Sequence, residues 1–235
     1  MNKIVLEELK SNIKLTGNEY VIKNENNDVV FDIENSSSVI FNVFNEEDTK
    51  VYYTFNVLEN SNLTINIFDA AREVKRNITI NVNGENSSVI LNLSCISLKE
   101  NNYIVNVYHN SKNTHSKTNL HGLALDNNSI FIQNNGYIRN GSTKSTLNQD
   151  NKIIIMNDNN SKIEPNLYID EYDTLASHGA YIGKFDEEEL FYLNSRGLDN
   201  KSSYNLLING FLLYEFVISD EDKVKLKNII EKYWG

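Results

Sequence analysis

Short segments of alternating apolar and polar residues recur through the first half of this chain, and each is introduced by Asn and Ser. Three of them read NSSSVIFNV, NSNLTINIF and NSSVILNLS, at residues 35–43, 60–68 and 86–94. A second alternating segment follows each of these, at residues 50–58, 76–84 and 102–110. Two short strands per repeat, joined by Asn, Ser and Gly turns, favour a β-solenoid in which stacked repeats bury one continuous core.

The alternation also predicts which side chains face that core. In the third repeat Val89, Leu91, Leu93 and Cys95 share one face of a strand, and the polar residues between them take the other face. The equivalent inward positions elsewhere are Val39, Phe41, Val43, Leu63, Ile65, Ile67, Ile130, Ile132, Ile153 and Ile155. The stretch from residue 109 to 165 continues the punctuation less regularly, so we interpret it as the closing turns of the same solenoid.

We therefore predict a mainly β protein, a right-handed β-helix over residues 28–184 with a short helical segment over residues 185–235. Residues 1–27 form a lead-in that contains a possible short helix at Lys3 to Leu9. A β-sandwich remains the alternative fold, because alternating strands and polar turns suit it as well.

Three helices are predicted after residue 184. Asp186 followed by Glu189 is a capping pattern that starts a helix near Glu187, and Gly197 is placed to end it. A second helix is expected from about Lys201 to Ile218, where large apolar residues recur at helical spacing. Ser219 caps a third helix together with Asp222. Three short helices cannot form an independent core, so they must cover the solenoid, bind a partner, or do both.

Charge and composition exclude several classes of partner. The formal net charge is −10, with a pI near 4.9, which argues against nucleic acid because a phosphate backbone requires clustered Lys and Arg. No apolar run approaches the length of a membrane span, and the first residues lack the apolar region of a signal peptide, so we expect a cytoplasmic protein without membrane contact. A single cysteine excludes an internal disulfide and a Cys-based zinc site.

The run SHGAYIGKFDEEELFYLNSRGL, which ends at Leu198, resembles the C-terminal signature of the SufB/SufD family, scaffold subunits of Suf iron–sulphur cluster assembly. It is closer to SufD, because SufB usually has Glu where Gly179 stands. The resemblance extends to a P-x-L-x-I strand at Pro165, to an H-x(4)-T-x-S segment at His109, and to LLINGF at residues 206–211. It covers about the last 130 residues well, and the first 100 only in style.

This resemblance implies a set of functional residues. His178 matches a family histidine implicated in cluster assembly at the SufB–SufD interface, and a neutral imidazole is a competent iron ligand. Asp150 falls where SufB has an important cysteine. It is a weaker candidate ligand, since a carboxylate can bind iron but cannot carry persulphide sulphur. A transient iron–sulphur cluster, not a stably bound one, is the expected cofactor.

The resemblance also implies partners, namely an ABC ATPase similar to SufC and, as dimer partner, a SufB-like paralogue or a second copy of the chain. Family members dock SufC through their C-terminal helices. The residues expected to contact that partner or the solenoid are Phe191, Tyr192, Arg196, Phe211 and Tyr214.

Other chemical candidates receive simpler interpretations. Cys95 occupies an inward position of the alternating pattern, which predicts a buried and inert thiol. His109, His115 and His121 recur every six residues, but equal spacing across a turn rarely gives convergent metal ligands. The carboxylates near residues 170–173 and 186–189 are expected to be solvated turn and helix-start acids, not a glycosidase pair. Neither a P-loop nor a G-x-S-x-G elbow is present.

The sequence thus predicts a non-enzymatic scaffold of a Suf-type assembly complex that docks a SufC-like ATPase through its C-terminal helices. The alternative is a carbohydrate-active or adhesive β-solenoid. That reading requires an acidic and basic cluster in a strand-built groove, which the sequence does not show.

Overall fold

The computed structural model describes residues 2–25 and 28–234. The strands are β1 (Lys3–Leu6), β2 (Asn12–Leu15), β3 (Glu19–Ile22), β4 (Val29–Ile33), β5 (Ser38–Asn45), β6 (Thr49–Val57), β7 (Asn62–Val82), β8 (Ser88–His109), β9 (His115–Ala124), β10 (Ser129–Ile138), β11 (Ser145–Ile155), β12 (Lys162–Ile169) and β13 (Thr174–Gly183). The helices are α1 (Glu187–Ser195), α2 (Asn200–Leu213) and α3 (Asp220–Trp234).

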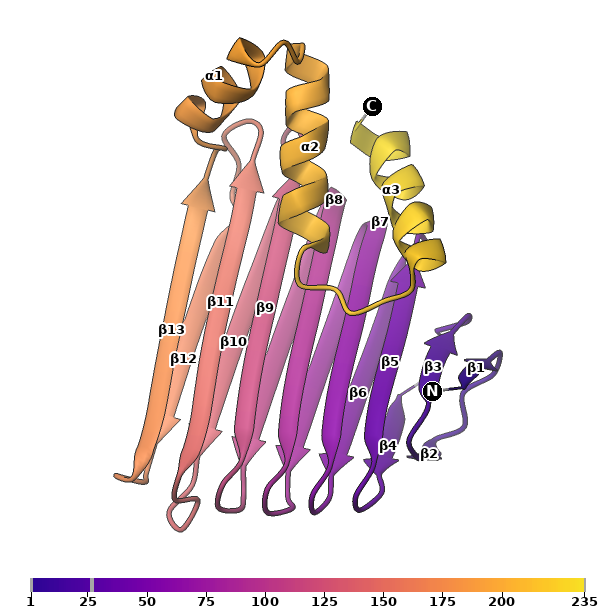
Figure 1. Cartoon of the computed structure of the whole chain (residues 1–235), viewed down its shortest axis with the longest axis vertical. Coiled ribbons are helices and arrows are strands. Elements are labelled where there is room, and N and C mark those ends of the chain that lie inside the picture. Colours follow the sequence, from indigo (N-terminus) through magenta and orange to yellow (C-terminus); the bar gives the residue numbers. More distant parts are fainter. Residues whose placement is uncertain (1, 26–27, 235) are drawn as a thin grey trace.

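The strands form a β-solenoid of about six turns, which confirms the predicted fold class and rules out the sandwich (Figure 1). Every strand pair within the described ranges is parallel, and one sheet runs in the order β1-β3-β5-β7-β8-β9-β11-β13. The opposite sheet contains β2, β4, β6, β10 and β12, whereas β7 and β8 are long enough to contribute to both. The chain rises along the front sheet, crosses the top and descends behind, so the coil is right-handed (Figure 1).

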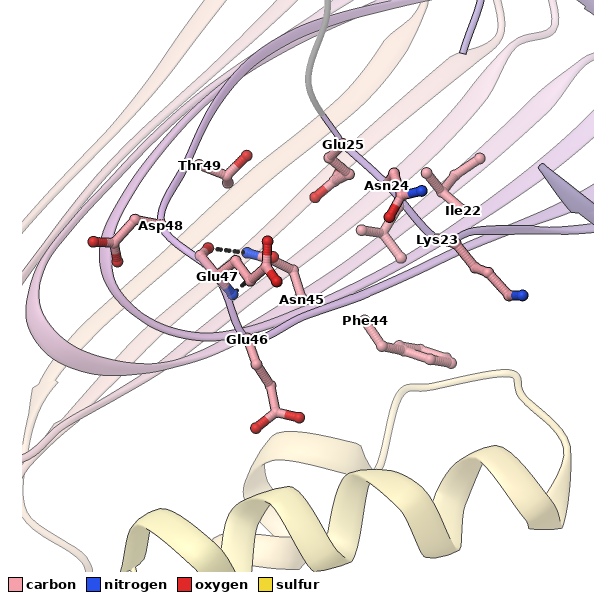
Figure 2. A pocket seen from close by; sticks show the side chains of 11 residues that line it. Ile22, Lys23, Asn24, Glu25, Phe44, Asn45, Glu46, Glu47, Asp48 and Thr49 are labelled. Carbon is pink, nitrogen blue, oxygen red and sulfur yellow. Dashed lines mark hydrogen bonds between the residues drawn. The ribbon is translucent and has the colours of Figure 1, made fainter. Parts of the chain in front are cut away.

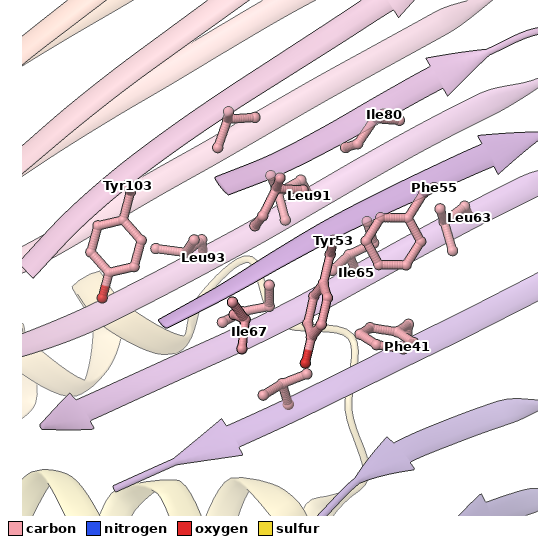
Figure 3. Packing of buried hydrophobic residues seen from close by; sticks show 14 of the residues in the cluster. Phe41, Tyr53, Phe55, Leu63, Ile65, Ile67, Ile80, Leu91, Leu93 and Tyr103 are labelled. Atoms are coloured by element: carbon pink, nitrogen blue, oxygen red, sulfur yellow. The ribbon is translucent and has the colours of Figure 1, made fainter. Parts of the chain in front are cut away.

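The core lies between the two sheets, where the predicted inward side chains meet (Figure 3). Phe31 stacks on Phe55 at 4.9 Å between ring centroids and meets Phe41 edge-to-face at 4.8 Å. Burying one such ring stabilises the fold by roughly 1.5–3 kcal/mol. Almost all of the inward positions expected from the alternation are buried, and only Ile155 remains partly exposed.

The recurrence of Asn and Ser between the strands has a conformational cause. Five turns at the lower end of the solenoid contain a residue with positive φ: Ser36, Asn60, Asn86, Asn113 and Lys144. Asn is among the few non-glycine residues that tolerate this left-handed conformation. In four of these turns the hydroxyl residue that follows is buried: Ser61, Ser87, Thr114 and Ser145. Ser87 Oγ, for example, accepts the backbone N–H of Ser61 at 3.1 Å from the coil before. The turns therefore favour Asn at the first position and have a hydroxyl residue at the second.

Helices α2 and α3 cover the upper part of the front sheet, whereas α1 lies beyond the top of β13 (Figure 1). Ile208 and Leu212 of α2 and Leu226 and Ile230 of α3 are buried in a second apolar cluster together with sheet residues such as Phe68. As predicted, Asp186 caps α1 and Gly197, with φ of +94°, follows its end. Ser219 also caps α3, because its hydroxyl oxygen accepts the N–H of Asp222 at 3.2 Å.

The expected end of the second helix was wrong. α2 ends at Leu213, and residues 214–219 form an irregular segment, here called the strap, that crosses the sheet before α3. Asn92 Nδ2 donates to the carbonyl of Glu215 at 2.7 Å, and Asn66 Nδ2 donates to that of Val217 at 3.0 Å. These bonds satisfy strap carbonyls that a longer helix would have used internally.

The short helix expected at Lys3 to Leu9 was also wrong, because β1 occupies residues 3–6. β1 pairs in parallel with β3, and β3 pairs with β5, so the solenoid pairing extends into the predicted lead-in. Lys3 contributes to this arrangement through an ion pair with Asp222 of α3 at 2.7 Å.

A buried ion cluster lies inside the upper corner of the solenoid. Arg76 is fully buried and donates to Asp69 through Nε at 2.8 Å and to Glu25 through Nη1 at 2.7 Å. Tyr53 and Tyr103 donate their hydroxyls to the same two carboxylates. Because the carboxylates are also nearly inaccessible, each depends on the guanidinium for charge compensation.

We therefore predict that Arg76→Met lowers the free energy of unfolding by about 3–5 kcal/mol, because it leaves two carboxylates buried and unpaired. Chemical denaturation measures this loss. Lys99→Met is the matched control, since it breaks the exposed pair of Lys99 with Glu73 and should cost less than about 1 kcal/mol. Equal losses in the two variants would contradict the role assigned to Arg76.

Candidate functional site

The last strand, β13, carries the predicted ligand His178 at an open end of the solenoid. β13 pairs with β11 along one side, and in that register His178 lies opposite Gln149. Gln149 is buried and faces the interior, so His178 takes the same, inward direction. No strand of the described chain stacks on the other side of β13, and the His178 ring is consequently exposed. The imidazole is thus accessible from the end of the solenoid.

The interior beneath His178 is polar, unlike the aromatic core of the earlier turns. Asn134 donates to Thr118 Oγ1 and to Asn151 Oδ1, both at 2.8 Å, and all three residues are buried. Gln149 donates to the backbone carbonyl of Asn134 at 3.1 Å. Asn151 also donates to the carbonyl of Gly179 at 2.9 Å, which fixes the backbone next to His178. These hydrogen-bonded amide side chains form a rigid polar layer next to the last strand.

Sequence reasoning missed this polar layer, although a signal was available. Residues 134, 149 and 151 occupy inward positions of the alternating pattern. The equivalent positions of earlier coils are mostly apolar, such as Val105, Leu91 and Leu93. A change from apolar to amide side chains at inward-facing positions indicates that the interior is polar at this end of the solenoid. The signal was hidden because Asn is abundant throughout the chain.

The second predicted ligand, Asp150, lies on the opposite face of the sheet from His178. Its carboxylate is 3.3 Å from His121 Nε2 and 2.8 Å from Lys152 Nζ. The contacts with His121 and Lys152 lower the pKa of the Asp150 carboxyl to about 2, so it is ionised at neutral pH. The structure therefore does not bring Asp150 and His178 into one set of ligands.

The α1–α2 hairpin presents three of the predicted partner residues to solvent. Phe191 is 74% exposed and Tyr192 is 56% exposed, and the Arg196 guanidinium lies over the Tyr192 ring at 5.1 Å. Beside them is a groove of about 390 Å³ with leucines and Tyr192 along it and the acidic residues Asp186, Glu188 and Glu189 at its rim. α1 itself has no buried residue, so one side of this helix is unoccupied.

The other two predicted partner residues differ from each other. Tyr214 is 85% exposed at the start of the strap. Phe211, by contrast, is half-buried, and its ring stacks on His121 at 4.9 Å between centroids. Phe211 therefore belongs to the contact between α2 and the solenoid, which is the second of the two positions expected for it.

The three evenly spaced histidines have different contact partners. His109 is buried. Its Nδ1 lies 2.7 Å from Thr114 Oγ1 and its Nε2 lies 2.7 Å from Ser116 Oγ, so the His, Thr and Ser of the H-x(4)-T-x-S segment contact one another. His115 contacts Thr146, and His121 lies under α2. Over residues 2–25 and 28–234, no three His, Cys, Asp or Glu side chains form a metal-binding group.

Cys95 is fully buried, as its parity predicted, and burial raises the pKa of its thiol to about 12. The thiol is therefore protonated and inert at neutral pH. Carboxylates near residue 171 also have the expected role in a turn: Glu171 accepts the backbone N–H of Gly141 at 2.9 Å, which lowers the pKa of its carboxyl.

A hollow of about 420 Å³ lies at the top corner, between residues 22–25 and 43–49 (Figure 2). Its lining is acidic, but three of its four carboxylates, those of Glu25, Glu46 and Asp48, have partners. Glu25 binds Arg76, Glu46 binds Lys232, and Asp48 accepts the backbone N–H groups of residues 72 and 73. The hollow is thus shaped by contacts that stabilise the corner.

Comparison with known proteins identifies the class to which this solenoid belongs. Residues 9–211 match the sequence profile described as "SUF system FeS cluster assembly, SufBD core domain". The match covers well over half of the chain, and the chain therefore belongs to the SufBD family.

Three relatives illustrate the similarity. The iron–sulphur cluster assembly protein SufD of Bacillus subtilis is 30% identical over 112 residues, which are 47% of this chain and 26% of that protein. A SufBD family protein of Pyrococcus horikoshii is 48% identical over 58 residues, 23% of this chain and 13% of the relative. SufD of Escherichia coli is 40% identical over 48 residues, 20% and 11% of the two chains. The matched parts span about a quarter or less of these relatives.

None of the helices among the described residues is both long and apolar enough to cross a membrane.

The buried His109 predicts a pH dependence of stability. Burial, and secondarily the nearby His115, lowers the pKa of His109 from 6.5 to about 4 in the folded chain. Between these two values the unfolded chain binds more protons, so the folded state loses stability as pH falls through this window. We expect a loss of about 3 kcal/mol between pH 7 and pH 4 from this residue alone.

Denaturation measured at several pH values tests this, with His109→Gln as control. Glutamine retains hydrogen-bonding groups but does not titrate, so the variant should show a flatter dependence between pH 6.5 and pH 4. Identical pH profiles for the two proteins would show that His109 does not carry the effect.

Proposed function

We propose that this chain is a non-enzymatic scaffold subunit in Suf-type iron–sulphur cluster assembly. The observation that carries the proposal is the SufBD core match over residues 9–211, on a parallel solenoid whose last strand exposes a histidine. The functional chemistry then lies at the end of the solenoid, where a partner's groups can join those of this chain. The cluster is cargo that is assembled and passed on.

In this proposal His178 supplies an iron ligand. Its imidazole is exposed, and an imidazole nitrogen is a suitable ligand for iron. Asn151 fixes the adjacent backbone through the Gly179 carbonyl, so the ligand is mounted on a rigid strand and not on a loop. Asp150 remains a weaker candidate, because it faces the other side of the sheet and is engaged by Lys152.

The free edge of β13 supports a dimer partner at the same end. Residues 174–183 contain no charged side chain and no proline, the features that usually protect an edge strand from pairing. Leu175 is 73% exposed there, and Tyr181 and Ile182 are also exposed. We propose that a SufB-like paralogue or a second copy of this chain covers the edge and completes the cluster ligands.

The α1–α2 hairpin is the proposed docking surface for a SufC-like ATPase. It offers apolar and aromatic groups around a groove with an acidic rim, which suits an apolar partner segment flanked by Lys or Arg. Arg196, held over Tyr192, adds a cation beside the aromatic surface. Nucleotide-driven movement of the ATPase would then act on the helices that cover the solenoid.

A binding experiment tests the docking proposal. We predict that Phe191→Glu weakens the affinity for a SufC-like ATPase at least about tenfold, because it places a charge in an apolar contact. Isothermal calorimetry with the purified ATPase measures the change. Val224→Glu is the control, since Val224 of α3 is 57% exposed but lies outside the hairpin and should leave binding intact. Unchanged affinity of the Phe191 variant would exclude the hairpin.

A cellular assay tests the ligand proposal. We predict that His178→Ala, in a strain whose cluster supply depends on this chain, lowers the activity of an iron–sulphur reporter enzyme severalfold. His115→Ala is the matched control, because His115 is bonded to Thr146 on the outer face of the sheet. Full reporter activity with His178→Ala, at equal protein level, would remove His178 from the proposed chemistry.

A further inference from the structure

A ladder of asparagines crosses the front sheet on its outer face, beneath the helices and strap. In each step Nδ2 of one asparagine donates to Oδ1 of the asparagine in the preceding coil. The steps are Asn66 to Asn42 at 2.8 Å, Asn92 to Asn66 at 3.0 Å and Asn119 to Asn92 at 2.8 Å. All four residues are buried, so each carbonyl oxygen needs a donor from the next coil.

The ladder fails at its last step. The position that stacks on Asn119 is Asp150, and a carboxylate, unlike an amide, has no N–H to continue the ladder. Asn119 Oδ1 is accordingly buried without a hydrogen-bond partner, in a residue that is 2% exposed. The orphan acceptor therefore belongs to the residue that pairs with Asp150 in the strand register.

His121 brings a third group to the same place. Its Nδ1 is 3.1 Å from the carbonyl oxygen of Phe211, which can only accept, so Nδ1 carries the hydrogen. Nε2 lies 3.3 Å from the Asp150 carboxylate, and it is either the second N–H of an imidazolium, which donates to Asp150, or a lone pair that a metal ion can use. An imidazolium would satisfy Asp150 and Phe211 but would leave Asn119 Oδ1 without a donor. A bound cation satisfies all three groups at once.

We propose that Asn119 Oδ1, His121 Nε2 and the Asp150 carboxylate form a binding site for a divalent first-row transition metal ion. One imidazole nitrogen with carboxylate and amide oxygens is a donor set that suits Zn²⁺, Fe²⁺ or Mn²⁺ better than Ca²⁺. The Phe211 carbonyl fixes the histidine tautomer, as backbone carbonyls do for metal-ligating histidines. Because Phe211 belongs to α2, the metal ion ties this helix to β9 and β11.

This site is separate from His178, which faces the other side of the sheet, and it does not depend on the proposed scaffold function. Asp150 is 33% exposed at its side chain, so water or a partner group can complete the coordination. Lys152 competes with a metal ion for Asp150. Its Nζ contacts Asp150 Oδ2, the oxygen that also faces His121, and its side chain is 43% exposed, so another rotamer can release that oxygen.

Titration of the full chain with Co²⁺, followed by visible absorption, and with Zn²⁺ by calorimetry tests the proposal. We expect one ion per chain. Asp150→Asn and His121→Phe should each weaken binding at least about tenfold. Asp150→Asn is the sharper variant, because an amide at this position can continue the ladder and so preserves the fold. His115→Ala is the control that should bind the ion as the unchanged chain does, because His115 contacts Thr146 and belongs to neither site.

Lys152→Met should move the affinity in the opposite direction. Removing the competing ammonium is expected to tighten binding about 2- to 5-fold. Absence of stoichiometric binding, or binding that survives Asp150→Asn in a folded protein, would overturn the site. Loss of binding in His178→Ala would instead place the metal at the end of the solenoid and equally refute this assignment.

Discussion

Parallel stacking in register is the constraint on which this structure depends. Each coil places its side chains directly above those of the coil before, so a residue is acceptable only if it can pack against or bond to its own equivalent. Branched apolar side chains meet this condition inside, where they interlock as the core. Asparagines meet it outside, because an amide donates to one neighbour and accepts from the other. Part of the abundant Asn therefore has a structural role, because these side chains bond neighbouring coils to each other.

The same constraint explains why both candidate sites lie near the last coil. A column of stacked residues is satisfied along its length but not where it ends. At β13 the inward positions lose their cover, which exposes His178, and the strand edge loses its partner. On the outer face the amide column meets Asp150 one coil earlier, which leaves Asn119 Oδ1 unpaired. Both candidate sites arise where repetition stops, on opposite faces of one sheet.

Much of the fold could be predicted from the sequence because its determinants are local. The alternation placed Cys95 in the core, and the caps at Asp186 and Ser219 fixed two helix starts to within a residue. The predictions were wrong where the local structure depends on contacts with segments that are distant in the sequence. The strap is set by side chains about 120 to 150 residues away, such as Asn92 and Asn66, and the ion pair of Lys3 joins opposite ends of the chain.

The candidate site was predictable only in part, for the same reason. The family-like motif located His178, but the direction of its ring follows from the register with Gln149, which the motif does not encode. Likewise, Asp150 and His178 were considered together as ligands, whereas strand alternation sends them to opposite faces. His121 looked like one of three equally spaced histidines, and its significance appears only with Phe211 and Asp150 beside it.

The attachment of the helices combines two kinds of contact that respond differently to a partner. The apolar cluster around Ile208 and Leu226 is buried and resists separation, as any core does. The α1–α2 hairpin has no such anchorage in α1, and it extends past the end of the sheet (Figure 1). A force applied through the hairpin would reach the solenoid mainly through α2, whose end is held by the polar contact of Phe211 with His121. That contact is therefore where movement of the helices and the state of the Asp150 site are coupled.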